Sequence, residues 1–179
     1  MTFLHDADVF IRAKNDHYGF DFYPGFWAWI RDAHERGAVF APKIVRDELV
    51  HGDDELAAWV KDLPPSFFVA PSPNTAPHFS AVSEWANSWK TRASSGSEQN
   101  KADSAVRDFF GKGDFYLVSQ AREREFVVVT NEVSAPGSKA RIKIPDACMA
   151  VGVRHMKPHE MLRIAGARFV MQSALSGPQ

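Results

Sequence analysis

The sequence predicts an α/β fold in which helices cover both faces of a mostly parallel central sheet, a three-layer sandwich. Apolar runs of strand length alternate with longer amphipathic segments, the order typical of parallel strands joined by helices. The clearest run is at 126–130, where continuous β-branched residues indicate a strand buried on both faces. The chain of 179 residues is long enough for one domain, which we expect to span residues 1–172 ahead of a disordered tail at 173–179.

The first half of the chain opens with a strand and continues mainly as helices. Pro24 suits the first turn of a helix, and Gly37 is a common helix stop. The acidic run at 53–55 suits the positive end of another helix. We expect strands at 2–5 and 67–69, and helices at 7–15, 24–37, 43–51 and from 53 to the prolines at 64–65.

The second half alternates helices with loops around the strand at 126–130. Proline content indicates a loop at 71–77, and small polar residues predict a mobile loop at 93–97. We expect helices at 79–92, 102–110, 115–124 and 158–165, a short helix from Pro145, a basic loop at 134–144, and a last strand at 168–171.

An aromatic block at 18–29 has two interpretations. Dense aromatic side chains are able to stack unpaired bases. Alternatively they belong to the core, because Phe26, Trp29 and Ile30 recur at helical spacing. On that second interpretation we expect Phe20 and Phe22 to be buried as well.

Composition limits the classes of protein to consider. The net charge of −1 argues against a uniformly basic nucleic-acid-binding surface, although a local basic strip is compatible with it. Cys148 is the single cysteine, so no intrachain disulfide forms, and we expect it to be buried. The seven histidines lack zinc-ligand spacing. No stretch predicts a membrane span or a signal peptide, so we expect a cytoplasmic protein with no membrane partner.

Acidic residues occur where a parallel sheet builds its sites, at strand tips and at the starts of the following helices. If these carboxylates converge, their mutual repulsion raises their pKa values unless a cation neutralises them. Mg²⁺ or Mn²⁺ is the natural cation for an oxygen-rich site, and such a site supports phosphodiester hydrolysis. The acidic residues in question are Asp6, Glu48, Asp114, Glu132 and Asp146.

Each acid taken alone also has a structural interpretation. Asp114 and Asp146 precede predicted helices, where Asp is a favoured cap. Glu48 lies on an amphipathic helix and is compatible with a solvated position. Asp6 differs, because a strand tip is an expensive place for an unpaired charge. The metal hypothesis therefore depends on the whole set.

The order of these motifs resembles that of the PIN-domain nucleases, and most closely a bacterial PIN-like family that carries only a domain-of-unknown-function label. The resemblance covers nearly the whole chain and rests on DADVFIRAKN, YGFDFYPGFW, VRDEL, VVVTNE and SKARIKIPDAC. It implies that Asp6, Glu48 and Asp114 are catalytic and hold the metal. Glu132 and Asp146 compete for the fourth acidic place. Asp8 is a departure, since the family usually has Asn there.

The resemblance implies a Mg²⁺- or Mn²⁺-dependent endoribonuclease, with RNA as substrate and an antitoxin protein or a homodimer as further partners to test. Lys139, Arg141 and Lys143 lie beside the acidic residues and fit phosphate binding, although a solvated loop explains them equally well. We also include Lys14, Asn15 and Thr130 among the candidate substrate contacts.

Two other functions remain open. A PIN-like fold that keeps its acidic residues is also compatible with a nucleic-acid or protein-binding module. The opening Asp6-x-Asp8 resembles the nucleophile motif of haloacid-dehalogenase phosphatases. That fold needs its closing acidic pair directly after a strand, whereas Asp53-Asp54 follows a predicted helix and Asp114 precedes its strand.

Overall fold

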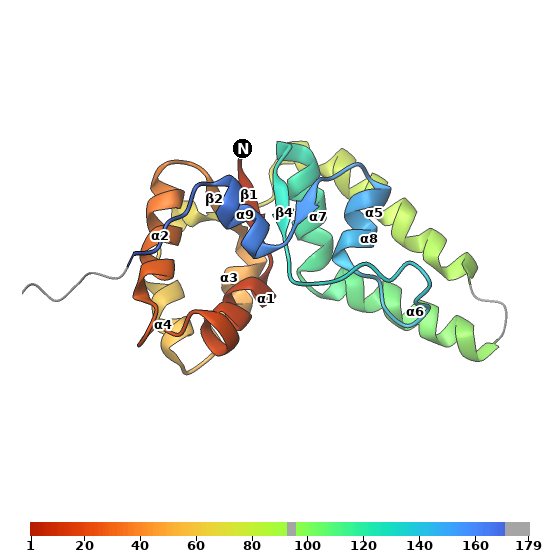
Figure 1. The fold of residues 1–179 in the computed structure, drawn as a ribbon. Helices are drawn as coiled ribbons and strands as arrows, with labels where there is room; N and C mark the ends of the chain where they lie inside the picture. The colour runs from red at the N-terminus through yellow and green to blue at the C-terminus, as the bar shows by residue number, and fades with distance from the viewer. Residues whose placement is uncertain (93–95, 171–179) are drawn as a thin grey trace, which may run out of the picture.

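The computed structural model describes residues 1–92 and 96–170, and it has the predicted three-layer α/β architecture (Figure 1). Within these residues, one five-stranded sheet is parallel throughout and lies between two layers of helices. The strands are β1 (Phe3–His5), β2 (Val39–Pro42), β3 (Phe68–Val69), β4 (Val127–Val129) and β5 (His155–Met156).

The helices divide between the two faces of the sheet (Figure 1). One layer contains α1 (Ala7–Arg12), α2 (Pro24–Glu35), α3 (Lys43–Leu49), α4 (Glu55–Lys61) and α9 (Pro158–Ile164). The other contains α5 (Ala76–Ser88), α6 (Gly96–Gly111), α7 (Asp114–Arg124) and α8 (Ile144–Ala150). No helix in the described part of the chain is both long and apolar enough to cross a membrane.

The strand order β3-β2-β1-β4-β5 creates a switch point beside β1. The chain moves outward from β1 to β3, then returns to add β4 and β5 on the other side of β1. His5 pairs in register with Val129, so β1 and β4 end side by side. In open parallel sheets, the crevice at the carboxyl ends of such strands is where ligands bind.

Side-chain alternation along the central strands divides the core in two. Phe3 and Val129 pack into the cluster shared with α1, α2, α4 and α9. Leu4 and Val128 point the other way, toward α5–α8. Because both faces are covered, β4 is apolar throughout, as the run at 126–130 predicts.

The predicted last strand is wrong. Residues 168–170 form no strand, and residue 171 lies outside the described residues. Phe169 instead packs edge-on against Tyr23, with ring centroids 5.4 Å apart. The sheet also contains β2 and β5, which were not predicted from the sequence.

Several boundaries also differ from prediction. Helix α6 begins at Gly96, so residues 96 and 97 of the predicted loop at 93–97 are helical. Residues 93–95 lie outside the described part of the chain. The predicted tail at 173–179 lies outside it too. Helix α1 ends at Arg12 and continues as a π-turn at Ala13–His17.

The aromatic block at 18–29 is mainly core. Phe26 and Ile30 are fully buried, and Phe20 stacks on the buried Trp27 at 4.0 Å between ring centroids. Phe22 is 66% exposed, which corrects the expectation that it is buried.

Candidate active site

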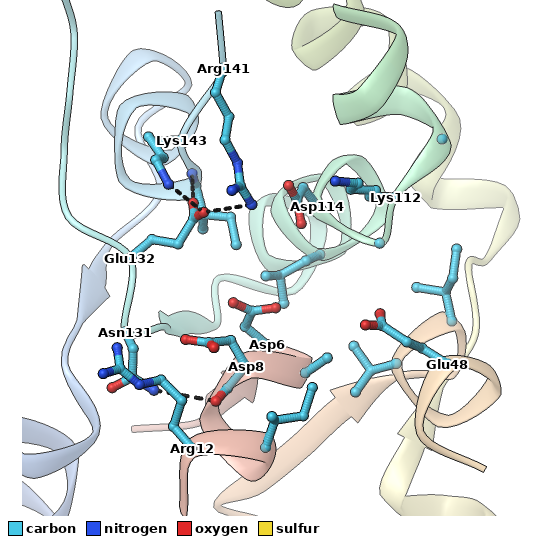
Figure 2. A pocket seen from close by; sticks show the side chains of 18 of the residues that line it. Asp6, Asp8, Arg12, Glu48, Lys112, Asp114, Asn131, Glu132, Arg141 and Lys143 are labelled. Carbon is cyan, nitrogen blue, oxygen red and sulfur yellow. Dashed lines mark hydrogen bonds and ion pairs between the residues drawn. The ribbon is translucent and has the colours of Figure 1, made fainter. Parts of the chain in front are cut away.

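A pocket of about 960 Å³ opens at the carboxyl ends of β1 and β4, at the switch point of the sheet (Figure 2). Its lining combines acidic side chains from four segments with basic ones at the same opening. The acidic residues are Asp6, Asp8, Asp47, Glu48, Asp114 and Glu132, and the basic ones include Arg12, Lys112, Arg141 and Lys143.

Asp6 lies at the centre of this pocket. Its backbone N–H donates to the Val129 carbonyl at 3.1 Å, which ties the tip of β1 to β4. The residue is 9% exposed, and the hydroxyl of Thr130 donates to its Oδ2 at 3.0 Å. Burial raises the pKa of Asp6 to about 7, and the negative charge of Asp114 adds to the rise.

Asp114 is the first residue of α7, and its carboxylate points toward Asp6 (Figure 2). The cap of this helix is Gly113, and no side chain caps it, so the alternative that Asp114 is an N-cap is wrong. Burial raises the pKa of Asp114 to about 6; Glu132 raises it further, whereas Arg141 acts in the opposite direction. Asp6 and Asp114 are therefore two coupled carboxyl groups that resist carrying charge together.

Glu48 and Asp8 face the same space from opposite sides (Figure 2). Glu48 projects from α3 as an exposed side chain, and its charge contributes to the raised pKa of Asp114. Asp8 is half-buried in the first turn of α1, and its charge contributes to the raised pKa of Asp6. The structure thus brings four of the five predicted acids to one pocket, Glu132 included, and adds Asp8 and Asp47.

Glu132 also lines the pocket, but its carboxylate is already paired. Oε1 accepts a hydrogen bond from Lys143 Nζ at 2.9 Å and lies 3.3 Å from Arg141 Nη2. Oε2 accepts from the backbone N–H of Ile144 at 2.8 Å. Glu132 therefore differs from Asp6 and Asp114, which have no ion pair within the residues described.

Two buried side chains, those of His5 and Cys148, provide no charge to this site. Burial lowers the pKa of His5 to about 4, so the ring is neutral at physiological pH. It stacks on Phe10, with ring centroids 5.4 Å apart. Burial also raises the pKa of the Cys148 thiol, which confirms the expectation that this cysteine is a buried neutral side chain.

Asp146, predicted as a catalytic and metal-binding residue, lies outside the lining of the pocket that contains the other four predicted acids. The side chain is 6% exposed. Its carboxylate accepts hydrogen bonds from the Ser134 hydroxyl and, at 3.0 Å, from the Ala135 backbone N–H. Asp146 therefore holds the start of the basic loop in place, and it is not the N-cap of α8, which is Lys143.

Replacing Asp146 by serine is expected to destabilise the protein by about 1–3 kcal/mol, because Ser134 and Ala135 lose their buried acceptor. The affinity for Mn²⁺ should be unchanged. Urea unfolding and calorimetric Mn²⁺ titration measure the two effects. A loss of Mn²⁺ binding at unchanged stability would restore Asp146 to the site.

Four of the predicted substrate contacts do not line the pocket. Lys14 pairs with Asp54 at 2.6 Å, and Asn15 is exposed outside the lining. Lys139 pairs with Glu98 at 2.7 Å. Thr130 is only 1% exposed, so it positions Asp6 and offers no surface to a substrate. Arg141 and Lys143 are the predicted contacts that do reach the pocket.

Sequence reasoning missed two basic residues of the site. Arg12 lies on the same short helix as Asp8, so four-residue helical spacing from Asp8 was the available signal. Lys112 lies two residues before Asp114, and its charge lowers the pKa of that carboxyl. Both were hidden because charged residues near helix ends are common on solvated surfaces.

The donor set fits a hard divalent cation. All of the candidate ligands are carboxylate oxygens, and Asp6 and Asp114 are crowded and unpaired. Across residues 1–92 and 96–170, no three His, Cys, Asp or Glu side chains stand close enough to hold one ion together. Mg²⁺ keeps several waters and commonly binds through one or two carboxylates, so the Asp6–Asp114 pair suits it. Zinc, which prefers Cys and His, does not suit this pocket.

Comparison with known proteins gives a family and no activity. No curated protein and no solved structure matches the chain. The match to a family model extends over residues 3–169, which include every acidic residue of the pocket. The chain belongs to the family described as Domain of unknown function (DUF4411).

Proposed function

We propose that the protein is a Mg²⁺- or Mn²⁺-dependent endoribonuclease. The observation that carries the proposal is the pair formed by the buried Asp6 and the half-buried Asp114, whose pKa values are raised to about 7 and about 6 at the switch point of the sheet. Raised carboxyl pKa values in a cleft are typical of functional sites. A cation that binds both groups would relieve their repulsion and keep them ionised at neutral pH.

Asp6 and Asp114 would hold the ion directly, and Asp8 and Glu48 would face it from either side. When bound, a divalent ion polarises phosphoryl oxygens and lowers the pKa of water, the chemistry that phosphodiester hydrolysis needs. Thr130 fixes the orientation of Asp6 by its hydrogen bond, so this carboxylate is held in place before any ligand arrives. Glu48, which is exposed, is the group best placed to accept a proton from water.

The basic residues around the opening support a phosphate-bearing substrate. Arg12, Lys112 and Arg141 are exposed, and each lines the same pocket as the acidic pair. Cations of this kind bind the backbone of nucleic acids without reading sequence. The choice of RNA and of an antitoxin partner rests on the resemblance to PIN-domain nucleases, whereas the proposed cytoplasmic location rests on the composition of the chain.

The proposal is tested by incubating the protein with a pool of single-stranded and structured RNAs in Mg²⁺, Mn²⁺ or EDTA. We expect cleavage with either ion, none in EDTA, and none from Asp114→Asn in any condition. Calorimetry should show Mn²⁺ binding to the wild type and its loss in that variant. Mn²⁺ binding without cleavage would favour the binding-module alternative. Absence of Mn²⁺ binding would reject the proposed function.

A further inference from the structure

The carboxylate of Glu132 contacts two basic side chains and the first backbone N–H of α8. Its side chain is 12% exposed, and each of its oxygens is occupied. Lys143 and Arg141 share Oε1, and the first backbone N–H of α8, at Ile144, donates to Oε2. A carboxylate has about four acceptor positions, and three of these are already used, two of them by cations, so Glu132 has little capacity left for a metal ion.

The backbone of Glu132 is fixed as firmly as its side chain. Lys157 Nζ donates to the carbonyls of Asn131 and Glu132, the latter at 2.7 Å. The Glu132 N–H donates to the Thr130 hydroxyl at 3.1 Å, and that hydroxyl donates to Asp6. The segment that follows β4, Thr130 to Glu132, therefore contacts Asp6 at one end and Lys143 and Arg141 at the other.

Arg141 extends between Glu132 and Asp114 (Figure 2). Its side chain is 56% exposed, whereas that of Lys143 is 24% exposed. A guanidinium has five N–H donors in a planar fork, so an ion pair with one carboxylate oxygen leaves donors for a phosphate. The guanidinium is thus held at the edge of the acidic pair with part of its surface open to a ligand.

We propose that Glu132 is a positioning residue, not a metal ligand: it holds Arg141 and Lys143 beside the Asp6–Asp114 pair so that they receive the substrate phosphate. The inference rests on the proposed function and assigns the phosphate subsite of that site. Placement of a phosphate within about an ångström governs turnover, because small errors in position remove the benefit of orientation. Overall affinity for a polyanion depends mainly on the number of cations.

Glu132→Gln separates these roles. Glutamine offers one acceptor oxygen, so either the cations or the Ile144 N–H lose their partner, and one negative charge disappears. We expect kcat to fall about tenfold, in line with the loss of a positioned group. We expect Mn²⁺ affinity by calorimetry to stay within about threefold of wild type, because the acidic pair is intact. Binding of a fluorescent RNA oligomer in EDTA, measured by anisotropy, should be equal or tighter, because an anion that competes for the two cations is gone.

Matched variants complete the experiment. Arg141→Ala with Lys143→Ala should weaken RNA binding and flatten its dependence on salt, since two phosphate contacts are lost. Lys139→Ala should change neither, because Lys139 pairs with Glu98 outside the pocket.

The possible outcomes are distinct. A tenfold or greater loss of Mn²⁺ affinity in Glu132→Gln would show that Glu132 is a ligand and overturn the inference while leaving the proposed function standing. Unchanged kcat, or weakened RNA binding in that variant, would overturn it too. A wild-type protein that neither binds Mn²⁺ nor cleaves RNA would reject the proposed function, and this inference with it.

Discussion

Asp6→Asn is expected to reduce metal-dependent RNA cleavage by at least about a thousandfold while making the metal-free protein more stable at neutral pH. The amide removes a ligand, and it also removes a charge that the fold tolerates poorly. The rise in the pKa of Asp6 from 3.8 to about 7 corresponds to roughly 4 kcal/mol, an upper limit for the gain in stability. Asparagine keeps an oxygen that accepts the Thr130 hydrogen bond.

Cleavage assays and urea unfolding in EDTA at pH 8 measure the two effects. Asp62→Asn is a suitable control, because its side chain is 75% exposed and pairs only with Arg31 among the described residues. That variant should have wild-type activity and stability within about 1 kcal/mol of wild type. Full activity in Asp6→Asn would remove Asp6 from the site.

The second large effect is a loss of stability as the pH rises, which Mn²⁺ should counteract. The folded protein holds a proton on Asp6 up to about pH 7, whereas the unfolded chain releases it near 3.8. The stability that this proton contributes is fully present below pH 3.8 and is lost as the pH rises through 7. Asp114 acts in the same direction, through about pH 6. Mn²⁺ competes with these protons, so it should stabilise the protein more at pH 8 than at pH 5.

His5 opposes this trend over part of the range. Burial lowers its pKa from 6.5 to about 4, so its contribution is lost as the pH falls below 6.5. Comparison with Asp6→Asn cancels the His5 contribution. We expect the advantage of the variant in unfolding free energy, measured without metal, to grow from pH 4 to about pH 7 and to level off above it. A constant difference across that range would show that the pKa of Asp6 is not raised.

Long elements and strand tips were predictable from the sequence, and pairings made by flexible side chains were not. The run at 126–130 revealed β4, and the acid after the first apolar run revealed Asp6 at its strand tip. By contrast, β2 and β5 were not predicted: β2 ends in a proline, and β5 has only two residues. Their positions depend on pairing with neighbours that are distant in the chain.

The same distinction holds within the site. The position of Asp114 was predictable because a helix that packs on a parallel sheet begins near the edge where the carboxyl ends of the strands lie. Asp146 has the same sequence signal, yet it turns to Ser134 and Ala135. Lys139 and Arg141 are two residues apart, and one pairs outside the pocket while the other reaches into it. Sequence order does not determine which way a long side chain extends from a loop.

The hydroxyl of Thr130 has a consequence for how Asp6 gains and loses its proton. This hydroxyl accepts from the Glu132 N–H and donates its own hydrogen to Asp6 Oδ2. While that bond is made, the acidic proton of Asp6 resides on Oδ1. Oδ2 then serves as the anchor, and Oδ1 is the oxygen that would exchange its proton for an ion. A single neighbouring threonine therefore makes the two carboxyl oxygens of Asp6 chemically unequal.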